Sequence, residues 1–112
     1  VGLIGYCWGG SLSWRAACQS KILSASVSYY GGDIPALKDQ TPFCKFLAHF
    51  GELDKGIPIE AVNQFKVAQP DVLTYTYPAD HGFNCNHRSQ YNKISSKIAL
   101  NRTKKFLDSQ LS

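Results

Sequence analysis

Residues 1–20, VGLIGYCWGGSLSWRAACQS, decide the fold class, because an apolar run leads into a helix-like stretch with no loop between them. Residues 1–6 are typical of a buried strand, and residues 12–20 place apolar side chains on one helical face. The junction is GYCWGG, residues 5–10. A chain that turns this sharply from strand to helix holds the residue at the apex in a strained conformation and directs its side chain outward. The sequence predicts that Cys7 occupies this apex.

A cysteine at this position has the properties of a nucleophile. The amino terminus of a helix carries a partial positive charge, which favours the thiolate form. The backbone N–H of Trp8 would supply half of an oxyanion hole. We expect small residues two positions before and after the cysteine, here Gly5 and Gly9, because the turn brings their backbones together. The alternative is an inert cysteine buried beside a tight turn, since unpaired cysteines are often buried.

The rest of the chain alternates strands with helices. Further strands are expected at residues 22–30, 43–50 and 72–77. Pro58 suits the first turn of a helix, and Pro70 would stop it. This alternation predicts an α/β fold, a three-layer sandwich with about four mostly parallel strands and flanking helices. We expect residues 1–112 to form a single domain.

A long helix is expected to close the chain, after a loop that runs from Pro78 to about Arg88. Its apolar residues lie broadly along one side: Tyr91, Ile94, Ile98, Phe106 and Leu107. The residues expected to face water are Lys97, Arg102 and Lys104. The apolar side is therefore the side expected to cover the sheet.

Composition excludes several classes of partner. The chain has 112 residues, of which 44% are hydrophobic and 18% charged, and its net charge is +4. Lys104-Lys105 is the only adjacent basic pair, so we expect no nucleic-acid partner. No apolar run reaches membrane-spanning length, and residues 1–5 lack the basic leader of a secretion signal. The four cysteines lie in apparent core elements, which favours reduced thiols in a cytoplasmic protein.

Two further residues come after predicted strands and complete a catalytic pattern. Asp54 comes after the strand at residues 43–50, and His81 comes after the strand at residues 72–77. Both are expected at the carboxyl edge of the sheet, where open α/β folds bind ligands. Taken singly, Asp54 would be interpreted as a turn carboxylate and His81 as a loop histidine. Together with Cys7 they have the order nucleophile, acid, histidine that is typical of α/β-hydrolases, with His81 as the base and Asp54 orienting its ring.

These motifs carry a resemblance that runs essentially from end to end of the chain. They are residues 5–10, Tyr30-Gly31, residues 49–54, residues 79–83, and the closing Ala99, Arg102 and Phe106-Leu107. The chain resembles the dienelactone hydrolase (carboxymethylenebutenolidase) family. The resemblance implies that Cys7 is the nucleophile of a triad with Asp54 and His81. It also implies hydrolysis of a cyclic enol-lactone or a related small ester through a thioester acyl-enzyme, with no cofactor.

The chain departs from the family in two ways. Members are roughly twice this length, so the chain resembles the C-terminal half of such an enzyme. The other half would supply the first strands, the second oxyanion-hole donor, a glutamate near the thiol and an arginine for the substrate carboxylate. The family enzyme that cleaves dienelactone has an arginine two residues after Phe83, where this chain has Cys85. Arg88 is the candidate to replace it in binding the substrate, so dienelactone itself is not the expected substrate.

Other residues with chemical potential have simpler interpretations. His49 lies inside a predicted strand and is expected to be a core histidine. His81, Cys85 and His87 could imitate a metal site, but no fourth ligand is apparent, so no metal is expected. Trp14 is expected to pack in the core, whereas Trp8 could line a pocket.

Three functions compete on these observations. The first is a cysteine hydrolase of small lactones or esters. The second is a non-catalytic half-enzyme that needs a partner chain for activity. The third, a thiol redox protein, is disfavoured because the chain has no C-x-x-C pair. Residues 1–6 would form an unprotected apolar edge strand, so we expect a homodimer or association with a separate amino-terminal half.

Overall fold

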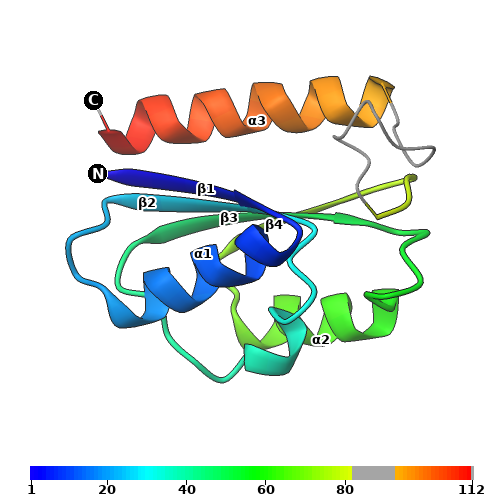
Figure 1. The fold of residues 1–112 in the computed structure, drawn as a ribbon, viewed down its shortest axis with the longest axis horizontal. Helices are drawn as coiled ribbons and strands as arrows, with labels where there is room; N and C mark the ends of the chain where they lie inside the picture. The colour runs from blue at the N-terminus through cyan, green and yellow to red at the C-terminus, as the bar shows by residue number, and fades with distance from the viewer. Residues whose placement is uncertain (82–92, 112) are drawn as a thin grey trace.

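The computed structural model describes residues 1–81 and 93–111 (Figure 1). Its elements are β1 (Gly2–Tyr6), α1 (Trp8–Gln19), β2 (Ala25–Tyr29), the short 3-10 helix η1 (Pro35–Leu37), β3 (Lys45–Gly51), α2 (Ile59–Ala68), β4 (Leu73–Tyr77) and α3 (Lys93–Leu111). Each predicted strand is present, although β2 is shorter than expected. Helices α1 and α2 cover one face of the sheet and α3 covers the other, which confirms the three-layer α/β fold.

The sheet has the order β1-β2-β3-β4, and every neighbouring pair is parallel. Tyr6 pairs with Tyr29, which in turn pairs with His49. At the same end of the sheet, Gly51 of β3 pairs with Tyr77 of β4. Because all strands run in one direction, their carboxyl ends meet at one edge, and the loops after those ends are brought together there.

The helices on both faces of the sheet explain why its two central strands are almost entirely buried. All five residues of β2 are buried, and β3 is buried from Phe46 onward, as expected for parallel strands that are covered on two sides. Trp14 of α1 is fully buried, with its ring edge-on to Phe46 and to Phe65 of α2. Its indole N–H donates to the carbonyl oxygen of Leu37 at 3.1 Å, so the ring packs without leaving a polar atom unpaired. The interpretation of Trp14 as a core residue is confirmed.

The predicted orientation of α3 is only partly right. Phe106 is buried and Lys97 and Lys104 are exposed, as expected. Ile94 and Ile98, however, are 74% and 41% exposed, and Tyr91 lies outside the described residues. The buried residues of α3 are Ser95, Ala99, Thr103 and Phe106.

The sheet face beneath α3 explains this orientation, because it is lined by polar aromatic side chains. Thr103 Oγ1 lies 2.9 Å from the hydroxyl of Tyr29 and 2.9 Å from Nε2 of His49. Buried polar atoms are costly unless they are paired, so α3 turns hydroxyl groups rather than isoleucines toward them. Arg102 was expected to face water, but its guanidinium carbon lies 4.0 Å from the ring centroid of Tyr75.

None of the helices in the described ranges is both long enough and apolar enough to cross a bilayer.

Candidate active site

The turn from β1 into α1 is strained at one residue. Cys7 has φ 54° and ψ −119°, a conformation that a residue with a Cβ rarely adopts. Its N–H donates to the carbonyl oxygen of Tyr29 at 3.0 Å, and its own carbonyl accepts from Gly10 at 2.9 Å and from Ser11 at 3.2 Å. These bonds fix the strained peptide against β2 and the first turn of α1. The prediction that Cys7 lies at a strained apex is confirmed.

The glycines around the apex differ in why they are needed. A Cβ on Gly5 would lie 1.9 Å from the carbonyl oxygen of Gly9, so no larger residue fits there. A Cβ on Gly9 would meet no atom within 4 Å outside its own helix, so the steric need predicted for Gly9 is wrong. The second tight position is Gly10, where a Cβ would lie 2.7 Å from Oγ of Ser28 on β2. The helix turns residue 10, rather than residue 9, toward the sheet.

Trp8 is the first residue of α1. The first N–H groups of a helix have no partner within the helix, so this amide can donate to an anion beside Cys7. The Trp8 side chain is 75% exposed. The role of the Trp8 N–H in an oxyanion hole stays a prediction.

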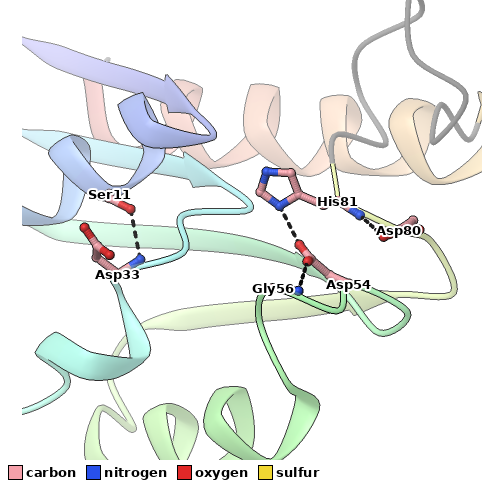
Figure 2. Close-up of polar contacts among 6 residues, drawn as sticks. All are labelled: Ser11, Asp33, Asp54, Gly56, Asp80 and His81. Atoms are coloured by element: carbon pink, nitrogen blue, oxygen red, sulfur yellow. Dashed lines mark hydrogen bonds and ion pairs between the residues drawn. The ribbon is translucent and has the colours of Figure 1, made fainter.

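Asp54 lies in the turn after β3 and is held there by backbone bonds to the end of β4. The N–H groups of Glu52 and Leu53 donate to the carbonyl oxygens of Tyr77 and Ala79, at 2.7 and 3.0 Å. The Asp54 carboxylate is buried, with its side chain 2% exposed. Oδ1 accepts from the Gly56 N–H at 2.9 Å, which leaves Oδ2 to face the next loop (Figure 2).

His81 faces that carboxylate from the loop after β4. Its Nδ1 lies 2.5 Å from Oδ2 of Asp54, and its side chain is 34% exposed. The backbone N–H of His81 donates to Oδ1 of Asp80 at 2.6 Å, which fixes the loop beside the ring (Figure 2). When Nδ1–H donates to the carboxylate, Nε2 is the nitrogen that can accept a proton. The structure therefore brings together the two residues predicted as acid and base.

Tyr30 is a site residue to which the sequence pattern assigned no role. It is buried, has φ 43°, and its ring centroid lies 5.0 Å from that of His81. Its neighbour Tyr29 accepts the Cys7 N–H, so Cys7 and His81 both lie against the end of β2. The signals in the sequence were a pair of tyrosines directly before Gly31-Gly32 and the Tyr30-Gly31 motif of the family resemblance, which carried no role for the ring. Such a pair does not by itself show which ring turns toward the site.

A cavity of about 500 Å³ opens beside the acid and base. It is lined by Gly32, residues 54–57, Asp80 and His81. A volume of this size is within the range of small-molecule sites.

Some of the predicted site cannot be placed. Arg88, the predicted substrate-binding residue, lies outside the described residues, as do Cys85 and His87 of the metal alternative. Within the described part of the chain, no group of three or more His, Cys, Asp or Glu residues could hold a metal ion.

His49 lies beneath the site and not in it. It is fully buried, with Nδ1 2.7 Å from the Tyr77 hydroxyl and Nε2 2.9 Å from Thr103 Oγ1. Burial lowers the pKa of His49 to about 3, and the positive charge of Arg102 adds to the effect. The imidazole is thus neutral and structural, as expected of a core histidine. It joins β3 to β4 and α3 just before the strands reach the site.

The comparison with protein families decides which family this fold and site represent. The model of the dienelactone hydrolase family matches residues 1–111. The chain belongs to the dienelactone hydrolase family. Two bacterial members carry the name "Putative carboxymethylenebutenolidase". The protein from Methylorubrum extorquens is 30% identical over 107 residues, and the protein from Synechocystis sp. is 32% identical over 126 aligned positions.

Solved structures of similar proteins have the same fold. A crystal structure from Klebsiella pneumoniae, named "Putative Dienelactone Hydrolase", matches 91% of this chain with a TM-score of 0.80 and 28% identity. An esterase of Pyrococcus furiosus matches 100% of the chain with a TM-score of 0.75. At 14% identity, this second likeness shows the fold alone.

The chain spans about half or less of the length of these relatives. The match covers 81% of this chain and 36% of the Methylorubrum protein, and 99% of this chain and 51% of the Synechocystis protein. It covers 49% of the Klebsiella chain and 55% of the Pyrococcus chain.

Proposed function

We propose that the chain carries the nucleophile, base and acid of a hydrolase of small lactones or esters, with Cys7, His81 and Asp54 in those roles. The observation that supports the proposal best is the 2.5 Å contact between Asp54 Oδ2 and His81 Nδ1. It lies at the same edge of the sheet as the strained Cys7. Membership of the dienelactone hydrolase family, with relatives named for carboxymethylenebutenolidase, favours an enol-lactone or a similar ester as substrate.

Acylation uses each of the three residues. Nε2 of His81 takes the proton from Sγ of Cys7, and the thiolate attacks the carbonyl carbon of the substrate. The N–H of Trp8 donates to the oxyanion that forms. The ester C–O bond then breaks, and the leaving oxygen takes the proton from His81, so that a thioester on Cys7 remains. Asp54 stays ionised throughout and stabilises the imidazolium.

Deacylation reverses the proton transfers. His81 takes a proton from water, and the resulting hydroxide attacks the thioester carbon. The C–S bond breaks, the carboxylic acid leaves, and Sγ recovers its proton from His81.

A non-catalytic half-enzyme is not favoured as the alternative. A strained Cys7 backbone costs roughly 1–3 kcal/mol, and a purely structural turn has no need of it. A carboxylate that is 2% exposed and faces a histidine is likewise a catalytic arrangement more than a packing one.

The acylation half-reaction tests the proposal. The chain is mixed with p-nitrophenyl acetate, and the release of p-nitrophenol and the acetyl group on Cys7 are monitored by absorbance and by mass spectrometry. We expect Cys7→Ala and His81→Ala each to abolish most of the burst. Asp54→Asn should slow it roughly a hundredfold or more, because the ring loses its orienting charge.

The matched control is Cys18→Ala, which removes a thiol far from the site and should acylate at the parent rate. An unchanged burst in His81→Ala would contradict the proposed base. Acetylation of Cys18 or Cys44 ahead of Cys7 would contradict the proposed nucleophile.

A further inference from the structure

A pair of thiols, Cys18 and Cys44, lies at the opposite edge of the sheet from the candidate active site. Cys18 is in the last turn of α1, and Cys44 directly precedes β3. The N–H of Phe43 donates to the carbonyl oxygen of Ala17 at 2.8 Å. Cys18 directly follows Ala17, and Cys44 directly follows Phe43. This one hydrogen bond therefore brings the two cysteines, which are distant in the sequence, side by side.

The surroundings of the two thiols are alike. Both are half-buried and pack against the same hydrophobic core, and neither is in a disulfide. Burial raises the pKa of both, that of Cys18 to about 11, and the nearby charge of Cys44 adds to the rise for Cys18. This effect of Cys44 on Cys18 agrees with the short separation that the Phe43–Ala17 hydrogen bond gives the two residues.

An open cavity gives small molecules access to Cys44. Cys44 lines an open cavity of about 540 Å³, together with Phe43, Lys45 and Asp71. Cys18 is not among the residues that line this cavity. A reagent that enters this cavity would meet Cys44.

We propose that Cys18 and Cys44 form a reversible disulfide when the chain meets a low-molecular-weight disulfide. The thiolate of Cys44 attacks one sulfur of the reagent, which makes a mixed disulfide and releases the first reagent thiol. The thiolate of Cys18 then attacks the Cys44 sulfur, and the second reagent thiol leaves. The protein loses two electrons and two protons, and the reagent disulfide is reduced to two thiols.

The bridge would join two elements that carry site residues at their other ends. α1 begins directly after Cys7, and β3 leads to Asp54. The bond would close a loop that contains β2 and η1, which restricts the unfolded chain and stabilises the folded one. The site would keep its geometry because the bond forms at the far edge of the sheet.

The test uses the full chain with Cys7→Ser and Cys85→Ser, so that only the two thiols remain, after circular dichroism shows that this variant is folded. It is incubated with oxidised glutathione, quenched with acid and digested without reductant. We expect a peptide pair linked through Cys18 and Cys44, a protein mass lower by two hydrogens, and no retained glutathione. The Tm should rise and return when dithiothreitol is added.

The matched control adds Cys18→Ser to the same background. It should keep one glutathione on Cys44 and show no rise in Tm, because no second thiol can displace the reagent. Stable glutathione on Cys44 while Cys18 is present would overturn the proposal, and so would bonds formed only between chains. If the double variant does not fold, the wild-type chain, oxidised and mapped in the same way, must yield the Cys18–Cys44 pair or the proposal fails.

Discussion

Cys7 keeps a conformation that isolated residues avoid, and its neighbours compensate for the strain. The N–H of Cys7 bonds to β2, and its carbonyl bonds to the first turn of α1. The close approach of Gly5 to the carbonyl of Gly9 lets the two elements meet without a loop. The hydrogen bonds to β2 and to α1 therefore hold Cys7 in its strained conformation.

The first prediction at the residue scale concerns these glycines. Gly5→Ala should destabilise the chain by about 3 kcal/mol or more, because its Cβ would overlap a backbone oxygen that cannot move without unwinding α1. Gly9→Ala is the matched control and should be neutral or more stable by up to about 1 kcal/mol, since alanine favours helices. Urea unfolding monitored by circular dichroism measures both. Equal losses in the two variants would contradict the close approach.

The sequence could predict Cys7, Asp54 and His81 because each comes after an apolar strand, and parallel strands bring the loops at their carboxyl ends to one edge. It could not predict that the ring of Tyr30 lies against His81. Its place against His81 depends on a positive φ at the end of β2, and a tyrosine gives no local signal for that conformation.

Polar side chains, as well as apolar ones, dock α3 onto the sheet. The hydroxyl of Thr103 lies between Tyr29 of β2 and His49 of β3, and Arg102 donates to the Tyr77 hydroxyl of β4 at 3.2 Å. Hydropathy patterns assign the buried face of a helix from its apolar residues, so they placed Ile94 and Ile98 on the buried face of α3. The same limit applies to α1, which begins at Trp8 rather than at residue 12. It buries Ser11 and Ser13 while Leu12 is exposed. The four strands were predicted more closely because they are largely covered on both sides.

The second prediction is a loss of stability in acid that arises from His49. Its pKa is about 3 in the folded chain and 6.5 when unfolded, so the unfolded chain binds the proton more tightly. The contribution of neutral His49 to the free energy of unfolding is complete above pH 6.5 and is lost as the pH falls toward 3. The full difference between the two pKa values corresponds to roughly 5 kcal/mol of stability. Urea unfolding between pH 5 and pH 7 should show stability rising with pH.

His49→Gln separates this effect from the titration of carboxylates. The variant should be less stable at pH 7 by about 1–3 kcal/mol, because one polar partner of Tyr77 or Thr103 is lost. Its stability should vary less with pH between 5 and 6.5 than that of the wild type. Parallel pH profiles in the two proteins would contradict a neutral, buried His49.

At the scale of the whole molecule, the sheet is protected unevenly. β1 and β4 are the two edge strands; β4 ends in the site, whereas β1 has large apolar side chains exposed around it. Those side chains are Ile4, Tyr6, Trp8 and Leu12, each 41% exposed or more. An apolar edge with unpaired backbone groups invites another chain.

We propose that the 112-residue chain, when alone in solution, pairs with a second copy through β1. Light scattering coupled to size exclusion at micromolar concentration should show a mass above 12.4 kDa. Ile4→Lys should return the chain to a monomer, because a charged edge resists pairing. Ile22→Lys, at a loop residue that is 77% exposed, is the matched control and should not change the mass. A wild-type monomer of 12.4 kDa would exclude the proposal.

The hydroxyl contacts of α3 have a consequence for its axial rotation. A helix held by aliphatic side chains can turn slightly about its axis at little cost, since dispersion forces have no preferred direction. Hydrogen bonds are directional, so the two contacts of Thr103 fix the angle at which α3 lies on the sheet. That angle turns Ile94 and Ile98 outward whatever their hydropathy. Both positions are therefore open to lysine or glutamate in a more soluble variant, with no change in how the helix docks.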